Sequence, residues 1–196
     1  MKHDLLLSNI ARHISLDKEE TEYFISLLSS RTLKKKNYLL EAGQPCTTIS
    51  YVNEGFLRAY YRDADDNETT IMFAVADWWI TDMTCFVNQT LSITSIEAIE
   101  DTSVFQLTKE NMERLFIKVP KFERFFRILM QNSYVREQSR VLQTLSLPAE
   151  ERYTAFLKKY PSIAGRLTQK QIASYLGITP EFLSVIRKNI SKGNVS

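Results

Sequence analysis

The sequence predicts an α+β fold in three parts, and three observations carry this prediction. Short runs that alternate apolar and polar residues fill the stretch from about 37 to 107, a helical period begins at Pro120, and residues 166–189 read as helix, glycine turn and helix. A chain of 196 residues is long enough for a medium domain and a small one. We therefore expect a jelly-roll β-roll domain with an N-terminal helix at 1–119, a long helix at 120–146 and a helix-turn-helix domain at 147–196.

The composition is that of an ordinary globular protein. Hydrophobic residues make up 44% of the chain and charged residues 24%, which allows a buried core without long disordered tracts. No apolar run approaches the ~18 residues that a membrane-spanning helix needs, and the N-terminus lacks a signal-peptide cleavage site. We expect a cytoplasmic protein without a membrane partner.

Residues that bind metals or perform catalysis are sparse. Cys46 and Cys85 fit neither a zinc pattern nor a disulfide framework, so we interpret them as small buried residues. His3 and His13 both lie in the N-terminal segment, which leaves the roll without histidine ligands. Catalytic triads and phosphate-binding glycine loops are also missing from a chain with 5 glycines. The sequence indicates no enzyme, no metal and no cofactor.

Charge is distributed unevenly along the chain. Residues 1–146 carry 17 Lys and Arg against 20 Asp and Glu, whereas residues 147–196 carry 8 against 3. A small basic unit attached to a mildly acidic one suggests a polyanionic partner, because Lys and Arg gain affinity by displacing counterions from phosphates. A solvated basic face without a partner would have the same composition.

The first part of the chain predicts a helical N-terminus followed by a β-roll. Apolar residues of the N-terminal segment recur at helical spacing, with Ser15 or Asp17 available as the N-cap. The β-like runs that follow are separated by turn formers such as Gly43 and residues 53–55. These runs are 38–40, 49–52, 57–61, 69–73, 92–99 and 103–107. Their alternation predicts an antiparallel roll or barrel.

Helical spacing returns after the last run. A short helix is predicted at 109–118, and a longer one begins at Pro120 and continues for roughly 26 residues, or ~39 Å at 1.5 Å per residue. Such a helix exceeds what the roll can cover, so we expect it to pair with its copy in a homodimer; a helix packed across both domains of one chain is the alternative. The residues expected along the dimer contact are Phe122, Phe126, Leu129, Met130 and Val141.

The helix-turn-helix prediction depends on two caps, a turn glycine and a small residue at the crossing. Thr168 caps a first helix, on which Ala173 allows close crossing, and Gly177 supplies the left-handed turn. Thr179 caps a second helix that has Pro180 at its first position. Two packed helices in any helical domain would be the plainer interpretation, but the features coincide as a DNA-binding motif requires.

We expect the outward side of the second helix to meet the major groove of double-stranded DNA. Residues on or near this side are Thr179, Pro180, Glu181, Ser184, Val185, Arg187 and Lys188. Phosphate contacts are expected from Gln169, Lys170, Arg187, Lys188 and Lys192, beside the cap residue Thr168. If the terminal helices served association instead, the chain would be a ligand-binding or protein-binding module, which is the alternative function.

With its parts in this order, the chain resembles the Crp/Fnr superfamily, which includes the cyclic-AMP receptor protein and the fumarate-nitrate reductase regulator. Gly43, residues 51–55, Asp77 and Pro120 stand where such proteins have turn glycines, the hairpin of the roll and the start of the dimer helix. The resemblance spans nearly the whole chain. It implies a homodimeric DNA-binding transcription regulator with a cyclic-nucleotide-binding-like sensor domain, and RNA polymerase as a candidate partner. Few residues follow Asn189, so we expect a short subgroup without the C-terminal β-wing.

The second helix departs from the relatives at base-reading positions. The relatives read bases with an Arg-Glu pair and a further Arg. Glu181 matches the Glu, which can accept a hydrogen bond from cytosine N4, whereas Pro180 and Val185 stand at the two arginine positions. The operator sequence of the relatives therefore does not carry over.

The sensor also departs from relatives that bind cyclic nucleotides through a Gly-Glu and a nearby Arg. Asp82 could imitate the Glu, but residues 63–108 hold nine carboxylates and no Lys or Arg. Cyclic nucleotides are not expected to bind unless a cation folds in from elsewhere, such as Arg58, Arg62 or Arg136. The effector is unknown. The pocket expected for it consists of Trp78, Trp79, Thr81, Asp82 and Thr84, although paired tryptophans at the edge of a roll are also typical of a core or an interface.

Overall fold

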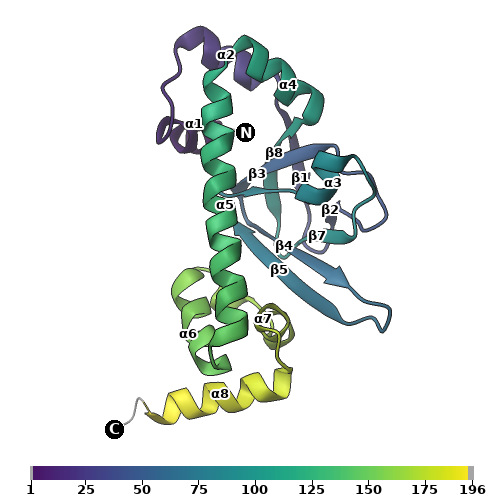
Figure 1. The fold of residues 1–196 in the computed structure, drawn as a ribbon, viewed down its shortest axis with the longest axis vertical. Helices are drawn as coiled ribbons and strands as arrows, with labels where there is room; N and C mark the ends of the chain where they lie inside the picture. The colour runs from purple at the N-terminus through teal and green to yellow at the C-terminus, as the bar shows by residue number, and fades with distance from the viewer. Residues whose placement is uncertain (1, 194–196) are drawn as a thin grey trace. The chain divides into compact units, whose positions relative to one another are not determined.

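The computed structural model describes residues 2–193, with the backbone alone at positions 192 and 193, and confirms the predicted α+β class. Helices flank a β-roll and form the C-terminal part (Figure 1). The helices are α1 (Asp4–Ala11), α2 (Lys18–Ser26), α3 (Met83–Asn88), α4 (Lys109–Lys118), α5 (Lys121–Ser146), α6 (Ala149–Lys159), α7 (Gln169–Leu176) and α8 (Pro180–Gly193), with a 3-10 turn at Ala164–Arg166. The strands are β1 (Ser29–Leu33), β2 (Tyr38–Leu40), β3 (Thr48–Glu54), β4 (Phe56–Arg62), β5 (Glu68–Val75), β6 (Trp79–Ile80), β7 (Thr94–Ala98) and β8 (Thr102–Thr108).

The helical N-terminus consists of two helices, and the second begins with a capping box. The Asp17 carboxylate accepts a hydrogen bond from the Glu20 backbone N–H at 2.9 Å, and the Glu20 carboxylate accepts one from the Asp17 N–H at 2.9 Å. Of the two candidate caps, Asp17 is therefore the one used. Glu20 also accepts from Lys121 Nζ at 2.8 Å, which ties α2 to the first turn of α5.

The roll consists of two four-stranded sheets with the orders β1-β8-β3-β6 and β2-β7-β4-β5. Six of these strands lie at the predicted runs. The other two, β1 and β6, are absent from the prediction. Four of the five β1 residues are exposed, so the strand lacks the alternation that marks a half-buried strand, and it is held by its antiparallel ladder to β8. Strand β6 has only two residues and pairs with β3.

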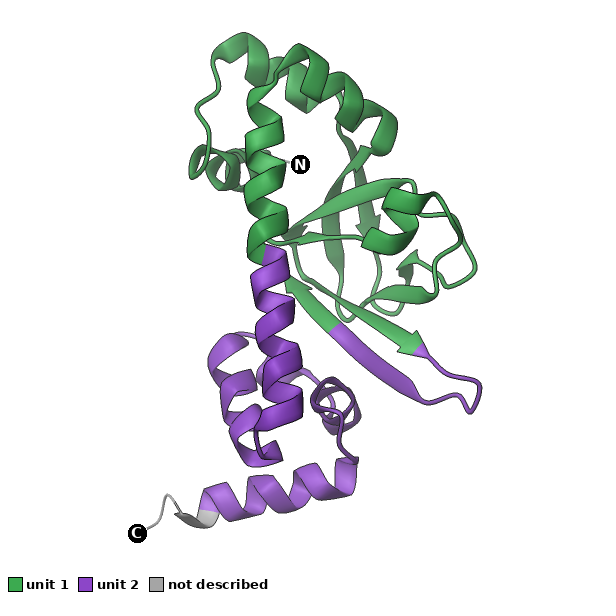
Figure 2. Cartoon of the chain, viewed as in Figure 1, with its two compact units in different colours: residues 1–61, 72–132 green, residues 62–71, 133–196 purple. Residues whose placement is uncertain are grey.

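The chain divides into two compact units, drawn in different colours in Figure 2. Unit 1 contains residues 1–61 and 72–132, and unit 2 contains residues 62–71 and 133–196. The division falls inside α5, whereas the sequence placed domain limits at the two ends of this helix. The tip of the β4–β5 hairpin belongs to unit 2, although it lies in the middle of the roll sequence.

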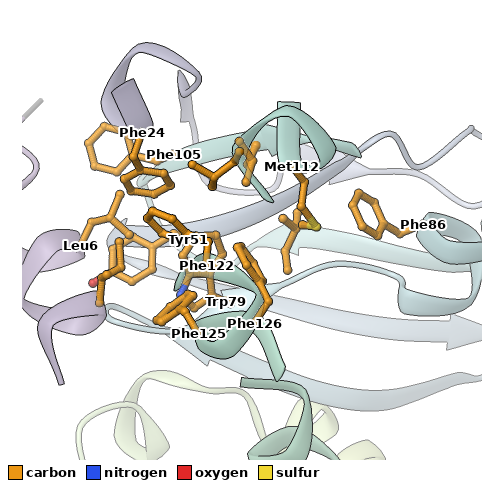
Figure 3. Close-up of a cluster of buried hydrophobic side chains, with 14 of the residues drawn as sticks. Leu6, Phe24, Tyr51, Trp79, Phe86, Phe105, Met112, Phe122, Phe125 and Phe126 are labelled. Carbon is orange, nitrogen blue, oxygen red and sulfur yellow. The ribbon is translucent and has the colours of Figure 1, made fainter. Parts of the chain in front are cut away.

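Aromatic side chains dominate the core of unit 1 (Figure 3). The ring centroid of Trp79 lies 6.0 Å from that of Phe125 and 5.6 Å from that of Phe126. Phe122 stacks on Phe24 of α2 at 4.7 Å. The first turns of α5 are therefore part of this core, packed against both the N-terminal helices and the roll.

This packing corrects two residues of the predicted dimer contact. Phe122 and Phe126 are only 0% and 6% exposed within one chain, so their side chains are not available to a second subunit. Leu129 packs against the same core, and Met130 lines an apolar pocket of unit 1. The apolar side chains that α5 exposes lie further along the helix, at Tyr134, Val135, Val141, Leu142 and Leu145.

Asp77 is a polar link between α1 and the roll. Its carboxylate accepts hydrogen bonds from Asn9 Nδ2 at 2.8 Å, Arg12 Nη2 at 2.5 Å and the Tyr51 hydroxyl at 2.8 Å. Burial by itself would raise the pKa of Asp77, but the hydrogen bonds from Arg12, Asn9 and Tyr51 outweigh burial and hold this pKa below its usual value. Burial and the Asp77 carboxylate raise the pKa of Tyr51, which keeps the phenol protonated as a donor.

We predict that Asp77→Asn weakens folding in a pH-dependent way. The substitution keeps the side-chain shape and tolerates the left-handed backbone found here at φ 74°, but it removes the charge. Because the pKa is lowered in the folded state, the ionised carboxylate stabilises the protein above the unfolded-state pKa of ~3.9, and this contribution is lost as the pH falls through the folded-state value. We expect a loss of about 1–3 kcal/mol at neutral pH, which shrinks on acidification.

Urea unfolding between neutral pH and about pH 3 measures this difference. The control is Asp65→Asn, which removes an exposed carboxylate and should change stability little at any pH. A destabilisation by Asp77→Asn that stays constant across the pH range would contradict the role of the charge.

Candidate nucleic-acid interface

Helix α7 has a well-defined beginning and end. The Thr168 hydroxyl accepts a hydrogen bond from the Gln171 N–H at 3.2 Å, and the Gln171 side chain accepts one from the Thr168 N–H at 2.9 Å, which forms a capping box. Gly177 ends the helix with φ 66°, a left-handed conformation that glycine adopts without strain. A Cβ at this position would meet only Arg152 Nη1 at 3.9 Å, so the backbone conformation and not the space calls for glycine.

Helix α8 follows after a short turn and packs on α7. The Thr179 hydroxyl accepts a hydrogen bond from the Phe182 N–H at 3.2 Å, and Pro180 occupies the first helical position. Ala173 of α7 is buried, as are Leu183 and Ile186 of α8. The caps, the turn glycine and the inward residues of the predicted helix-turn-helix are therefore all found.

The solvent side of this pair carries the residues expected to contact DNA. Thr168, Lys170, Thr179, Glu181, Ser184, Val185, Arg187 and Lys188 are exposed, and Gln169 and Pro180 are half-buried. The Gln169 side chain donates a hydrogen bond to the Pro180 carbonyl at 2.5 Å, so it also joins the starts of α7 and α8. The side chain of Lys192 lies outside the described residues.

The exposed side of α8 combines positive charge with apolar surface. Glu181 is the one acidic residue of this helix, and Arg187 and Lys188 form no ion pair with any other described residue. Phe182 is 51% exposed and Val185 is 52% exposed, three positions apart on the helix. The sequence prediction did not include Phe182, although its helical spacing from Val185 was a usable signal.

Helix α6 contacts the C-terminal end of α7. Arg152 Nη1 of α6 donates a hydrogen bond to the Leu176 carbonyl at 2.6 Å, which satisfies an acceptor that the end of α7 leaves open. The rings of Phe156, Tyr160 and Tyr175 pack together, with centroids 5.3 to 5.7 Å apart. The sequence prediction contained no helix at Ala149–Lys159.

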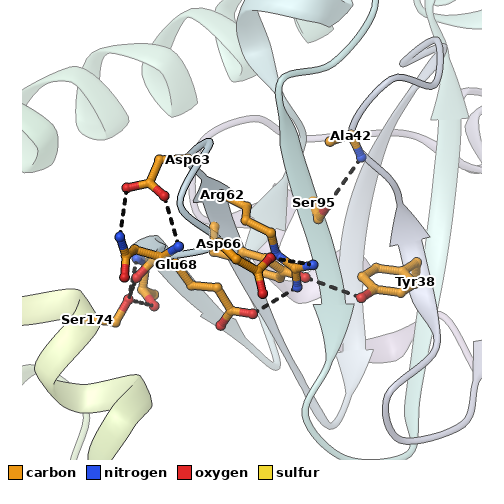
Figure 4. Close-up of polar contacts among 11 residues, drawn as sticks. Tyr38, Ala42, Arg62, Asp63, Asp66, Glu68, Ser95 and Ser174 are labelled. Carbon is orange, nitrogen blue, oxygen red and sulfur yellow. Dashed lines mark hydrogen bonds and ion pairs between the residues drawn. The ribbon is translucent and has the colours of Figure 1, made fainter. Parts of the chain in front are cut away.

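The tip of the β4–β5 hairpin also contacts α7 (Figure 4). Ser174 accepts a hydrogen bond from the Thr70 N–H at 2.8 Å, and its hydroxyl donates to the Glu68 carbonyl. Arg140 of α5 donates to the carbonyls of Ile71 and Thr70. All these residues belong to unit 2. The hairpin tip therefore contacts α7 at Ser174, and Arg140 of α5 in turn holds the hairpin tip.

The five residues expected to contact an effector have different surroundings in the structure. Trp79 is part of the aromatic core, and its indole N–H donates to Asn9 Oδ1 at 3.4 Å. Asp82 is buried and caps α3 through the Cys85 N–H, and it accepts from Ser92 and Thr94 at 2.6 and 2.9 Å. The roll pocket, of about 290 Å³, is lined by Thr81 but not by the other four residues.

One cation, Arg31 of β1, is among the residues that line this roll pocket. Its Nη atoms donate to the carbonyls of Leu39 at 3.1 Å and Tyr38 at 2.8 Å. The candidate cations Arg58 and Arg62 do not line the pocket: Arg58 is buried with its guanidinium over the Tyr60 ring, and Arg62 forms an ion pair with Glu68 at 3.0 Å. Arg136 lines a different pocket, in unit 2.

None of the helices between residues 2 and 193 is long and apolar enough to cross a membrane. The same residues include no group of three or more His, Cys, Asp and Glu side chains arranged to hold a metal ion. Cys46 and Cys85 are buried free thiols, and the Cys46 N–H donates to Cys85 Sγ at 3.0 Å.

Known proteins are similar to this chain in the roll and along nearly its whole length. The cyclic nucleotide-binding domain family matches residues 30–118. The fumarate and nitrate reduction regulatory protein of Vibrio cholerae is 22% identical over 98% of this chain and 81% of its own length. Over nearly its whole length the chain is therefore similar to transcription regulators of the Crp/Fnr type.

Solved structures of regulators share the fold. The c-di-GMP-responsive global regulator CLP of Xanthomonas campestris superposes with a TM-score of 0.74, at 14% identity, over 91% of this chain and 93% of that one. A transcriptional regulator of the Crp/Fnr family from Eubacterium rectale superposes with a TM-score of 0.71, at 19% identity, over 91% of this chain and 85% of that one. The similarity therefore includes the long helix and the C-terminal helices as well as the roll.

Proposed function

We propose that the protein is a homodimeric transcription regulator of the Crp/Fnr type that binds double-stranded DNA through α8. The observation that carries this proposal is the exposed side of α8, where Arg187 and Lys188 form no ion pair with a described residue and Glu181, Ser184 and Val185 face solvent. In a helix-turn-helix, two capped helices pack against each other and the second one enters the major groove. In a dimer, two such helices would contact half-sites about one helical turn apart, ~34 Å. RNA polymerase is a candidate partner of a regulator of this kind.

Each group on this face has a separate role in the proposal. Arg187 and Lys188 bind phosphates, which carry no sequence information. Glu181 accepts a hydrogen bond from a cytosine N4, and Phe182 with Val185 packs against thymine methyl groups. The exposed Phe182 also favours a second candidate function, in which α8 contacts another protein, since an exposed aromatic side chain suits either partner.

The proposed sensor does not use cyclic nucleotides as its effector. A bound cyclic phosphate needs charge-assisted partners, and the guanidinium of Arg31 already donates to two backbone carbonyls. Of the five residues expected to contact an effector, Trp79 lies in the core, Asp82 caps α3 and Thr81 lines the pocket.

We predict that Arg187→Ala with Lys188→Ala weakens binding to all DNA sequences to a similar degree. The slope of log affinity against log salt is negative, and each lost phosphate contact should make it shallower by ~0.9. Glu181→Ala should instead relax the preference at one base pair, by about 1–3 kcal/mol. Fluorescence anisotropy with a bound operator from genomic footprinting, over a salt series, measures both effects. Unchanged affinity and salt slope in the double variant would favour the protein-contact function.

We predict that the protein is a dimer held by the exposed apolar side chains of the second half of α5. Val141 is 58% exposed and Leu145 is 80% exposed, four positions apart on the helix. Val141→Asp with Leu145→Asp should give a folded monomer, because neither side chain belongs to the core of one chain. Ser146→Asp adds a charge without removing apolar surface and serves as the control. Sedimentation velocity at micromolar concentration measures the mass, and a monomeric native protein would overturn the dimer.

We predict that cyclic AMP and cyclic GMP bind with dissociation constants no tighter than roughly 10 μM, because a missing charged partner weakens a ~1 μM site by one to two powers of ten. Isothermal titration calorimetry with each nucleotide measures this. Arg31→Gln tests the one pocket cation, and we expect it to change nothing. Micromolar binding that Arg31→Gln abolishes would show that Arg31 serves as the phosphate anchor and would refute the prediction.

A further inference from the structure

A pocket in unit 2 lies among α5, α6 and α7 and has a volume of about 280 Å³. Four of the residues that line it are cations: Arg136 and Arg140 come from α5, and Arg152 and Lys159 come from α6. No acidic residue is among the lining residues. The pocket includes Tyr175 and Leu176 at the C-terminal end of α7, whereas Lys170 lies near the start of this helix. None of the lining residues belongs to α8.

Four positive groups in one small pocket repel one another, and an anion bound among them would relieve this repulsion. Some compensation comes from the protein itself. Arg140 lies 3.8 Å from the Glu137 carboxylate, and the Tyr175 ring lies 5.0 Å from Arg140 Cζ and 5.8 Å from Lys159 Nζ. Lys159 donates to the neutral Tyr175 hydroxyl at 3.1 Å, which leaves its charge in place.

The donors of Arg152 are only partly used. Its Nη1 donates to the Leu176 carbonyl at 2.6 Å, while its Nε is buried without an acceptor among the described residues. A buried N–H of a guanidinium that lacks an acceptor costs free energy, and an anion would recover it only by drawing the Arg152 side chain toward itself. Arg152 therefore has donor capacity that the described residues do not use, beside the three other cations of the lining.

We propose that this pocket binds a small phosphorylated metabolite. A phosphate group carries close to two negative charges and three acceptor oxygens, which suits several converging guanidinium and ammonium groups better than a single carboxylate does. The hydroxyl of Thr144 and the amide of Gln143, also in the lining, supply polar contacts for an organic part beside the phosphate. Binding of this metabolite does not require that α8 binds DNA.

The location of the pocket connects it to α7. Arg152 holds the carbonyl at the end of α7, and Arg140 holds the hairpin carbonyls next to Ser174. An anion that draws these two cations toward itself changes how α7 is supported. If the proposed DNA-binding function is correct, the metabolite is an effector that alters the affinity for DNA.

The test measures binding of inorganic phosphate and pyrophosphate to the full chain by calorimetry at low ionic strength, with chloride as the reference anion. We expect pyrophosphate to bind more tightly than phosphate, and Arg136→Gln and Lys159→Gln each to weaken pyrophosphate binding roughly 10- to 100-fold. The matched control is Lys158→Gln, which removes the neighbouring exposed cation that does not line the pocket, and it should stay within about twofold. Arg136→Lys keeps the charge without the fork and should give an intermediate affinity.

Three results would overturn the proposal. These are no binding of pyrophosphate by the native protein, equal losses in Lys158→Gln and Lys159→Gln, and competition in which duplex DNA displaces pyrophosphate and Arg136→Gln lowers DNA affinity equally. The last result would assign these cations to the nucleic-acid contact. Failure of DNA binding by α8 variants with intact pyrophosphate binding would refute the proposed function alone.

Discussion

Helix α5 is one unbroken backbone whose two halves have different chemistry, and both compact units depend on it. Its first turns carry Phe122, Phe125 and Phe126 into the aromatic core of unit 1. Its second half exposes apolar residues to solvent and directs Arg136 and Arg140 into the pocket of unit 2. With 3.6 residues per turn, successive side chains of a helix point in different directions, and at 1.5 Å per residue the 26 residues of α5 extend over a long distance. One helix can therefore contribute to a core, an open apolar surface and a charged pocket.

The second constraint is the number of independent contacts that position α7. Its start is closed by a capping box, its end by Gly177 and Arg152, and its outer face by the hydrogen bonds between Ser174 and the hairpin tip. Helix α8 takes its position from α7 through buried Ala173. Any ligand or substitution that changes these contacts therefore acts on the surface proposed to bind DNA, without contacting that surface.

Two groups of cations in unit 2, on α8 and in the pocket, have different surroundings. Arg187 on α8 is exposed, where solvent and salt screen its interactions, so it suits the reversible phosphate contacts of DNA binding. The cations around Arg152 and Lys159 are partly withdrawn from water, where a charge interacts more strongly and an unpaired donor costs more. This difference in exposure is the physical reason for assigning the two groups to different anions.

The sequence by itself determined the features that local chemistry controls: six of the strands, the long helix, and the caps and turn of the helix-turn-helix, because period, capping and a left-handed glycine are properties of short segments. Only the tertiary structure decided that β1 exists, that Trp79 and Phe126 belong to a core and not to a ligand pocket or a dimer contact, and that four cations line one pocket. Each of these facts depends on residues far apart in the chain, whose proximity is set by packing and leaves no periodic signal in the sequence.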